Sequence, residues 1–141
     1  MGSAGGGRRR RTIMAPSEKR ACCTDASKLI FACSGAADVG AIADQAARKL
    51  TRDGAGRMYC LAGIGGRVPG IMKSTEAAGG ILAIDGCSHD CAKHCLEEAG
   101  FTQFQHMRVT DLGMGKGTSP ATEDNIAKVA AKGTAALATT C

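Results

Sequence analysis

Residues Gly80-Ile81-Leu82-Ala83-Ile84-Asp85 form the clearest buried strand in the sequence, and the predicted fold is built around them. It is an uninterrupted apolar run of strand length, and Gly86 directly after it marks a turn. Two similar runs precede it, at residues 28–33 and 57–62. A fourth run, at residues 102–109, has mixed polarity, which is typical of a strand at the edge of a sheet.

Helical patterns lie between these runs. Residues 37–51 repeat apolar side chains at helical spacing, and a short helix is expected near residues 69–78. Another helix is expected to begin in residues 86–90 and to end at Gly100, a common C-terminal helix cap. The last helix is expected over residues 122–137, because a threonine followed by two acidic residues is a typical helix start.

Strands that alternate with helices predict an α/β fold. We expect a single three-layer domain over residues 28–141, with a mostly parallel four-stranded sheet and helices on both faces, of the Rossmann or flavodoxin type. With a strand order of 2-1-3-4, the order reverses between the first and third strands. Binding sites form outside the C-terminal ends of strands at such a point. The residues directly after each strand are therefore the candidate functional residues.

The 141-residue chain carries its excess charge at one end. The formal net charge is +5; residues 1–20 hold six basic residues and one acidic residue, and the remainder holds 12 of each. Residues 1–27 have no apolar period and predict a disordered, Gly- and Arg-rich basic tail. Charge alone could bring this tail to nucleic acid or anionic lipid, but a solvated tail is the simpler interpretation, and we expect no nucleic-acid partner.

The sequence gives no sign of a membrane span or a secretion signal. No stretch approaches the ~18 consecutive apolar residues that a spanning helix needs. The residues after the arginines are too short and polar for the apolar part of a signal peptide. We therefore expect no membrane partner and a cytoplasmic location, where cysteines are more often metal ligands or redox groups than structural disulfides.

Four of the eight cysteines lie where the predicted strands end. Cys33 ends the first strand, Cys60 lies near the end of the second, and Cys87 directly follows the third. Cys91 is expected one turn into the next helix, on the same face as Cys87. Four thiolates at ~2.3 Å satisfy a tetrahedral zinc ion. We therefore predict a small, cysteine-rich metal-binding protein that holds one zinc ion at the C-terminal ends of the strands, with Cys33, Cys60, Cys87 and Cys91 as ligands.

The same sulfur atoms allow other chemistry. An iron–sulfur cluster also uses four thiolates, and other soft metals also prefer sulfur. Cys87 and Cys91 could instead serve a thiol redox or sulfur-transfer enzyme. A buried cysteine is also a common small hydrophobic residue, an interpretation that competes most strongly at Cys60 and is favoured for Cys95. Whether the protein is an enzyme, and on which substrate it acts, stays open.

The remaining candidates are less defined. Cys22 and Cys23 lie at the end of the basic tail, and we expect them to be exposed and inert, with Cys141 frayed. His89 is either an exposed residue at a helix start or a metal ligand. Asp85 either orients a ligand or caps the turn after its strand.

Three motifs resemble a family of small proteins that is named for an Asp-Gly-Cys motif, the DGC domain. The resemblance rests on Phe31–Gly40, on Cys60–Gly65, and on Ile84–Cys87 together with Cys91–Lys93, and it covers about residues 28–133. It implies a cysteine-based, zinc-binding domain whose biochemical role is not settled. The family's cysteines fall on the positions that the strand ends select: Cys33, Cys60, Cys87 and Cys91.

The sequence departs from the family pattern at two places. Ser88-His89 stands where such proteins often carry a proline beside the motif cysteine, and Cys95 is an additional thiol. These departures leave open whether His89 replaces a sulfur ligand or Cys95 joins the set.

Overall fold

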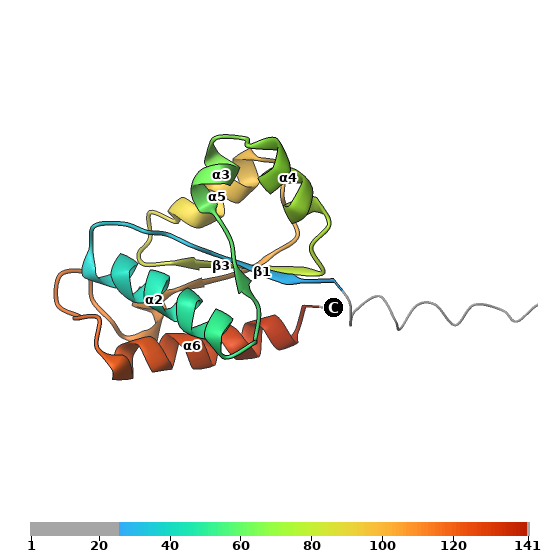
Figure 1. The fold of residues 1–141 in the computed structure, drawn as a ribbon. Coiled ribbons are helices and arrows are strands. Elements are labelled where there is room, and N and C mark those ends of the chain that lie inside the picture. Colours follow the sequence, from blue (N-terminus) through green and yellow to red (C-terminus); the bar gives the residue numbers. More distant parts are fainter. Residues whose placement is uncertain (1–25, 141) are drawn as a thin grey trace, which may run out of the picture.

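A computed structural model describes residues 26–140 and contains one sheet of four parallel strands in the order β2-β1-β3-β4 (Figure 1). The strands are β1 (Lys28–Ala32), β2 (Arg57–Met58), β3 (Gly80–Asp85) and β4 (Gln105–Arg108). The predicted order is confirmed, with β1 and β3 central. The predicted N-terminal tail up to residue 25, with Cys22 and Cys23, and Cys141 lie outside the described residues.

Helices cover both faces of this sheet (Figure 1). On one face lie α2 (Asp38–Arg52) and α6 (Glu123–Ala138). On the other face lie α3 (Leu61–Gly65), α4 (Pro69–Glu76) and α5 (Cys91–Glu98). A short 3-10 turn, η1 (Val109–Leu112), follows β4. The three-layer α/β fold expected from the sequence is confirmed.

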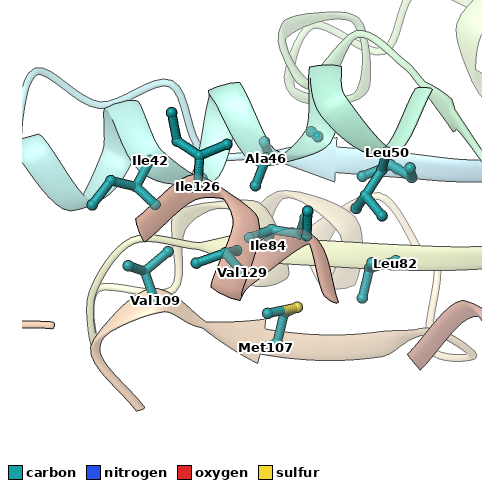
Figure 2. Close-up of a cluster of buried hydrophobic side chains, with 14 of the residues drawn as sticks. Ile42, Ala46, Leu50, Leu82, Ile84, Met107, Val109, Ile126 and Val129 are labelled. Atoms are coloured by element: carbon teal, nitrogen blue, oxygen red, sulfur yellow. The ribbon is translucent and has the colours of Figure 1, made fainter. Parts of the chain in front are cut away.

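The core is divided in two by the sheet, because alternate residues of the buried central strands point to opposite faces. Figure 2 shows the larger half, in which Leu82 and Ile84 of β3 pack beneath α2 and α6. Phe31 of β1 and Ala83 of β3 face the other way and pack with Ile64 and Leu96 of the opposite helical layer. The larger half contains no aromatic side chain, whereas the four aromatic residues of the chain, Phe31, Tyr59, Phe101 and Phe104, all lie in or against the smaller half.

Two predicted elements differ from the structure. The second strand was expected over residues 57–62, but β2 ends at Met58 and helix α3 begins at Leu61. A short apolar run does not by itself distinguish a strand from a helix. The helix after β3 was expected to begin in residues 86–90, but it begins at Cys91, because Asp90 adopts a left-handed conformation with φ of 51°. Cys87 and Cys91 therefore do not share a helix face.

The other elements follow the prediction closely. β3 has the predicted bounds, and β4 lies at a sheet edge as expected, although it is shorter than the predicted run. Helix α6 begins after Thr122, whose side-chain oxygen accepts a hydrogen bond from the backbone N–H of Asn125 at 3.3 Å. This contact is the N-terminal cap that the sequence predicts.

Candidate functional site

A pocket of about 700 Å³ opens at the C-terminal ends of β1 and β3, where the strand order reverses. Cys33, Cys87 and Cys91 all line it, and we call it the cysteine pocket. His89 and Lys116 also line its wall. The position is the one at which open parallel sheets bind ligands. Three of the four predicted ligands therefore line one pocket, Cys33 from the end of β1 and Cys87 and Cys91 from the connection between β3 and α5.

Cys33 is held at the base of the pocket by the backbone. Its N–H donates to the carbonyl of Ile84 at 3.0 Å, and its Sγ accepts a hydrogen bond from the N–H of Gly86 at 3.2 Å. Burial raises the pKa of the Cys33 thiol, although the N–H groups of Gly86 and Gly35 act in the opposite direction. A positive charge in the pocket would offset this burial and favour the thiolate.

Gly86 allows the strand end to approach α2 closely. A Cβ at this position would lie 2.7 Å from the backbone nitrogen of Gly40 and 2.8 Å from the carbonyl carbon of Val39. These are backbone atoms of a helix, so they cannot rotate away as a side chain can. The glycine therefore sets the distance between β3 and α2, and with it the position of Cys87 at the pocket.

Asp85 holds the start of the helix that carries Cys91. Its buried carboxylate accepts hydrogen bonds from the N–H groups of Ala92 at 2.7 Å and Lys93 at 3.1 Å. Asp90, the residue directly before α5, makes no such side-chain bond. The Asp85 carboxylate thus caps helix α5 across space and not the turn after its own strand, as one of the two predicted roles had it; the other predicted role, orienting a ligand, stays a prediction.

Asp90 instead joins α5 to β4. Its carboxylate forms two hydrogen bonds with the guanidinium of Arg108, at 2.6 and 2.5 Å, which hold the pKa of Asp90 below its usual value. The Nε2 atom of His106 lies 3.0 Å from Oδ2 of Asp85 and 3.6 Å from Oδ1 of Asp90. Sequence analysis missed this group, because its members come together only when β4 pairs with β3.

Asp85, Asp90 and His106 are the one group of potential metal ligands within 4.8 Å of one another in residues 26–140, and the cysteine sulfurs do not form such a group. The carboxylates are already engaged by backbone N–H groups and by Arg108. The cluster is therefore a structural connection between α5 and β4.

Cys60, the fourth predicted ligand, lies apart from the cysteine pocket. It precedes α3, is exposed, and its Sγ accepts a hydrogen bond from the N–H of Gly63 at 3.4 Å. It lines a separate depression with Arg48 and Arg52 of α2, whereas its neighbour Leu61 lines the cysteine pocket. Three predicted ligands thus line one pocket, although their three sulfur atoms do not all lie within 4.8 Å of one another, and Cys60 lies outside that pocket.

Cys95 is half-buried and packs against the smaller half of the core, as expected for an accessory or core residue. Burial raises the pKa of its thiol, and the neighbouring Cys91 and Asp85 act in the same direction. Its thiol does not line the cysteine pocket.

The glycine-rich loop of residues 113–120 lies at one side of the cysteine pocket, and Asp38 holds it there. The Asp38 carboxylate accepts hydrogen bonds from the N–H groups of Gly117 and Ser119, both at 2.9 Å, and from Val39 at 2.8 Å. The bonds from the loop are the main reason that the pKa of Asp38 is lowered. Lys116 is thereby positioned at the pocket wall. Sequence analysis missed this contact, although an acidic residue in a first helical turn was a visible signal.

A comparison with protein families identifies the domain. The model described as the DGC domain matches residues 29–132. The chain belongs to the DGC-domain family. The resemblance based on the cysteine motifs is confirmed, and the Asp-Gly-Cys motif that gives the DGC domain its name is Asp85-Gly86-Cys87 at the end of β3.

One curated relative gives the extent of the similarity. The anaerobic and virulence modulator AnvM of Pseudomonas aeruginosa is 35% identical over 92 residues, which cover 65% of this chain and 70% of AnvM. No solved structure matches the chain. Among the helices of the described part, none has the length and apolar character that a membrane span requires.

Proposed function

We propose that this DGC-domain protein binds one metal ion, most naturally zinc, through the thiolates of Cys33, Cys87 and Cys91. The observation that carries the proposal is that three free thiols, from the ends of β1 and β3 and the start of α5, line one pocket at the reversal point of the sheet. Free thiols also suit a reducing compartment such as the cytoplasm, which we propose as the location.

The donor set fits zinc and other soft metals. Sulfur is the donor that these metals prefer, and a thiolate that accepts a backbone N–H, as Cys33 does from Gly86, is stabilised in its charged form. A bound cation supplies the positive charge that offsets the burial of Cys33. Three features of the chain position these thiols. The N–H of Gly86 holds the Sγ of Cys33, Gly86 lets β3 approach α2 closely, and Asp85 caps the helix that carries Cys91.

A fourth ligand would complete the tetrahedral coordination. Cys60 is the fourth ligand predicted from the sequence, and the residue after it, Leu61, lines the cysteine pocket. His89 lines the pocket directly. We propose Cys60 as the fourth ligand, reached by a movement of the segment between β2 and α3, with His89 as the competing choice.

The principal test is metal content of the reduced protein after exposure to zinc and removal of excess ion. We expect about one zinc per chain, and thiolate-to-metal absorption after cobalt substitution. Replacing Cys33, Cys87 or Cys91 with serine lowers zinc affinity by at least about tenfold, since losing even a hydrogen-bonding partner of a ligand costs about that much. Cys95→Ser is the matched control and retains wild-type affinity. A reduced, folded chain with no zinc affinity would contradict the proposal.

The fourth ligand is identified by two further variants. Cys60→Ser weakens zinc binding and changes the cobalt spectrum if Cys60 is the ligand, whereas His89→Gln leaves both unchanged. The reverse pattern assigns the position to His89 and removes Cys60 from the set.

The alternative chemistries separate in the same samples. An iron–sulfur cluster gives visible absorption and acid-labile sulfide in protein supplied with iron and sulfide. A thiol enzyme retains turnover without metal and loses it in folded Cys87→Ser protein. Zinc at one ion per chain with neither property supports the metal-binding proposal.

A further inference from the structure

The cysteine pocket is larger than a metal ion and its ligands require. Its volume of about 700 Å³ lies in the range of small-molecule sites, roughly 300–1,000 Å³. Much of its wall is aliphatic. Ala36 and Ala37 lie just before α2, Val39 lies in the first turn of α2, and Leu61 begins α3. The space is therefore suited to a small molecule with an apolar body.

The charge of the wall selects the kind of polar group that such a molecule carries. No aspartate or glutamate is among the residues that line the pocket, and Lys116 is the lining residue with a permanent charge. Its ammonium makes no ion pair with any residue in the described range 26–140. The N–H groups of Gly117 and Ser119, which follow Lys116 in the loop, donate to the Asp38 carboxylate and hold this part of the loop in place. An anionic group, such as a carboxylate, complements this wall.

The accessible thiol of the pocket is Cys91. It is exposed, whereas Cys33 and Cys87 are each half-buried. The sulfur of Cys33 is also engaged by the N–H of Gly86. A molecule that enters the pocket and reacts with sulfur therefore meets Cys91 first.

We propose that the cysteine pocket is a site of reversible S-thiolation by small disulfides that carry carboxylates, with Cys91 as the attacking thiol and Lys116 as the carboxylate-binding residue. In this step the Cys91 thiolate attacks one sulfur of the disulfide RS–SR. The Cys91 S–SR bond forms as the RS–SR bond breaks, and the leaving RS⁻ takes up a proton from water. Cys91 is oxidised and one RS group is reduced to RSH, so the small disulfide is the oxidant.

This inference goes beyond the proposed metal site and does not depend on it. The reaction requires metal-free, reduced protein, whereas zinc affinity is measured in a separate experiment. If the chain binds zinc but Cys91 does not react as expected, only the thiolation proposal fails. If Cys91 reacts as expected but the chain has no zinc affinity, only the metal proposal fails.

The test compares two probes on the full-length reduced chain: the anionic disulfide dithiobis-nitrobenzoate and the neutral dithiodipyridine. Each reaction is stopped at short times by alkylation, and modification is followed at each cysteine by peptide mass spectrometry. Cys60 is the internal control, because it is also exposed but lies beside Arg48 and Arg52, away from Lys116.

We expect Lys116→Glu to slow modification of Cys91 by the anionic probe by about fivefold, the upper end of what an exposed charge interaction gives. The rate with the neutral probe, and both rates at Cys60, stay unchanged. Asp38→Asn also slows the anionic probe at Cys91, because the loop that positions Lys116 is less firmly held. An unreactive Cys91 in wild-type protein, or equal rates for wild type and Lys116→Glu with the anionic probe, overturns the proposal.

Discussion

Replacing Gly86 with alanine tests whether the Asp-Gly-Cys motif fixes the distance between β3 and α2. The added Cβ would meet the backbone nitrogen of Gly40 at 2.7 Å and the carbonyl carbon of Val39 at 2.8 Å. Carbon atoms pack at about 3.5–4.0 Å. The start of α2 therefore has to move by several tenths of an ångström.

The expected loss of stability follows from this overlap. Overpacking a tight interior position costs about 1–3 kcal/mol, and backbone atoms on the opposing side favour the middle of that range or above. We expect the free energy of unfolding to fall by about 2 kcal/mol and the melting temperature to fall by about 8 °C for a domain of this size. Zinc affinity also falls, because the N–H of Gly86 moves relative to the Sγ of Cys33.

The assay is urea denaturation followed by circular dichroism, with zinc affinity measured on the same samples. Gly70→Ala is the matched control, because Gly70 lies in helix α4 and its added Cβ would meet nothing within 4 Å. That control is expected to be neutral or more stable by up to about 1 kcal/mol. If Gly86→Ala is as stable as Gly70→Ala, the close approach of β3 and α2 is not a constraint on this fold.

Three further predictions concern the helix cap, the ion pair and the metal. Asp85→Asn weakens the cap of α5 and lowers stability by about 1–2 kcal/mol, with faster hydrogen exchange at Ala92 and Lys93; unchanged exchange would contradict this role. Asp90→Asn lowers the melting temperature at pH 7. Because the pKa of Asp90 is lowered in the folded state, its stabilising effect is present above about pH 4 and disappears as the pH falls through its folded pKa, so the two proteins converge in acid. Zinc at a hundred times its Kd stabilises the chain by about 2.7 kcal/mol, and a chelator reverses this.

Much of the fold is predictable because its central strands have strong local patterns. The run from Gly80 to Asp85 is apolar throughout, as a strand covered on both faces must be, and the structure gives it the same bounds. Helix α6 is likewise recognisable from Thr122 and its acidic first turn. In both cases the sequence pattern and the tertiary environment favour the same conformation.

The errors lie where a short segment is decided by its neighbours. After Tyr59 donates its N–H to Ile30 at 2.8 Å, the chain leaves the sheet edge and Cys60 becomes the cap of α3. An apolar pattern alone could not indicate this exit. Helix α5 cannot begin before Cys91, because Asp90 adopts a left-handed conformation. Aspartate tolerates this conformation better than most residues.

The candidate site was predictable in position but not in detail. Cys33, Cys87 and Cys91 line one pocket as the strand-end argument expects, since the ends of parallel strands meet at the same edge, but Cys60 does not, and the ligand set itself stays a prediction. The contacts that shape the pocket join residues far apart in the chain, such as Asp38 with Gly117. No local pattern reports such contacts, because each partner alone is an ordinary surface residue.

X-ray absorption at the zinc edge is the decisive experiment for the proposed thiolate site, because it counts the atoms bound to the metal and identifies them. For wild-type protein loaded with one equivalent of zinc, we predict at least three sulfur ligands at about 2.3 Å, with the sulfur count reduced by one in Cys91→Ser. A spectrum with only oxygen and nitrogen ligands, or one that is the same in Cys91→Ser, would contradict a zinc site built from the thiols of the cysteine pocket.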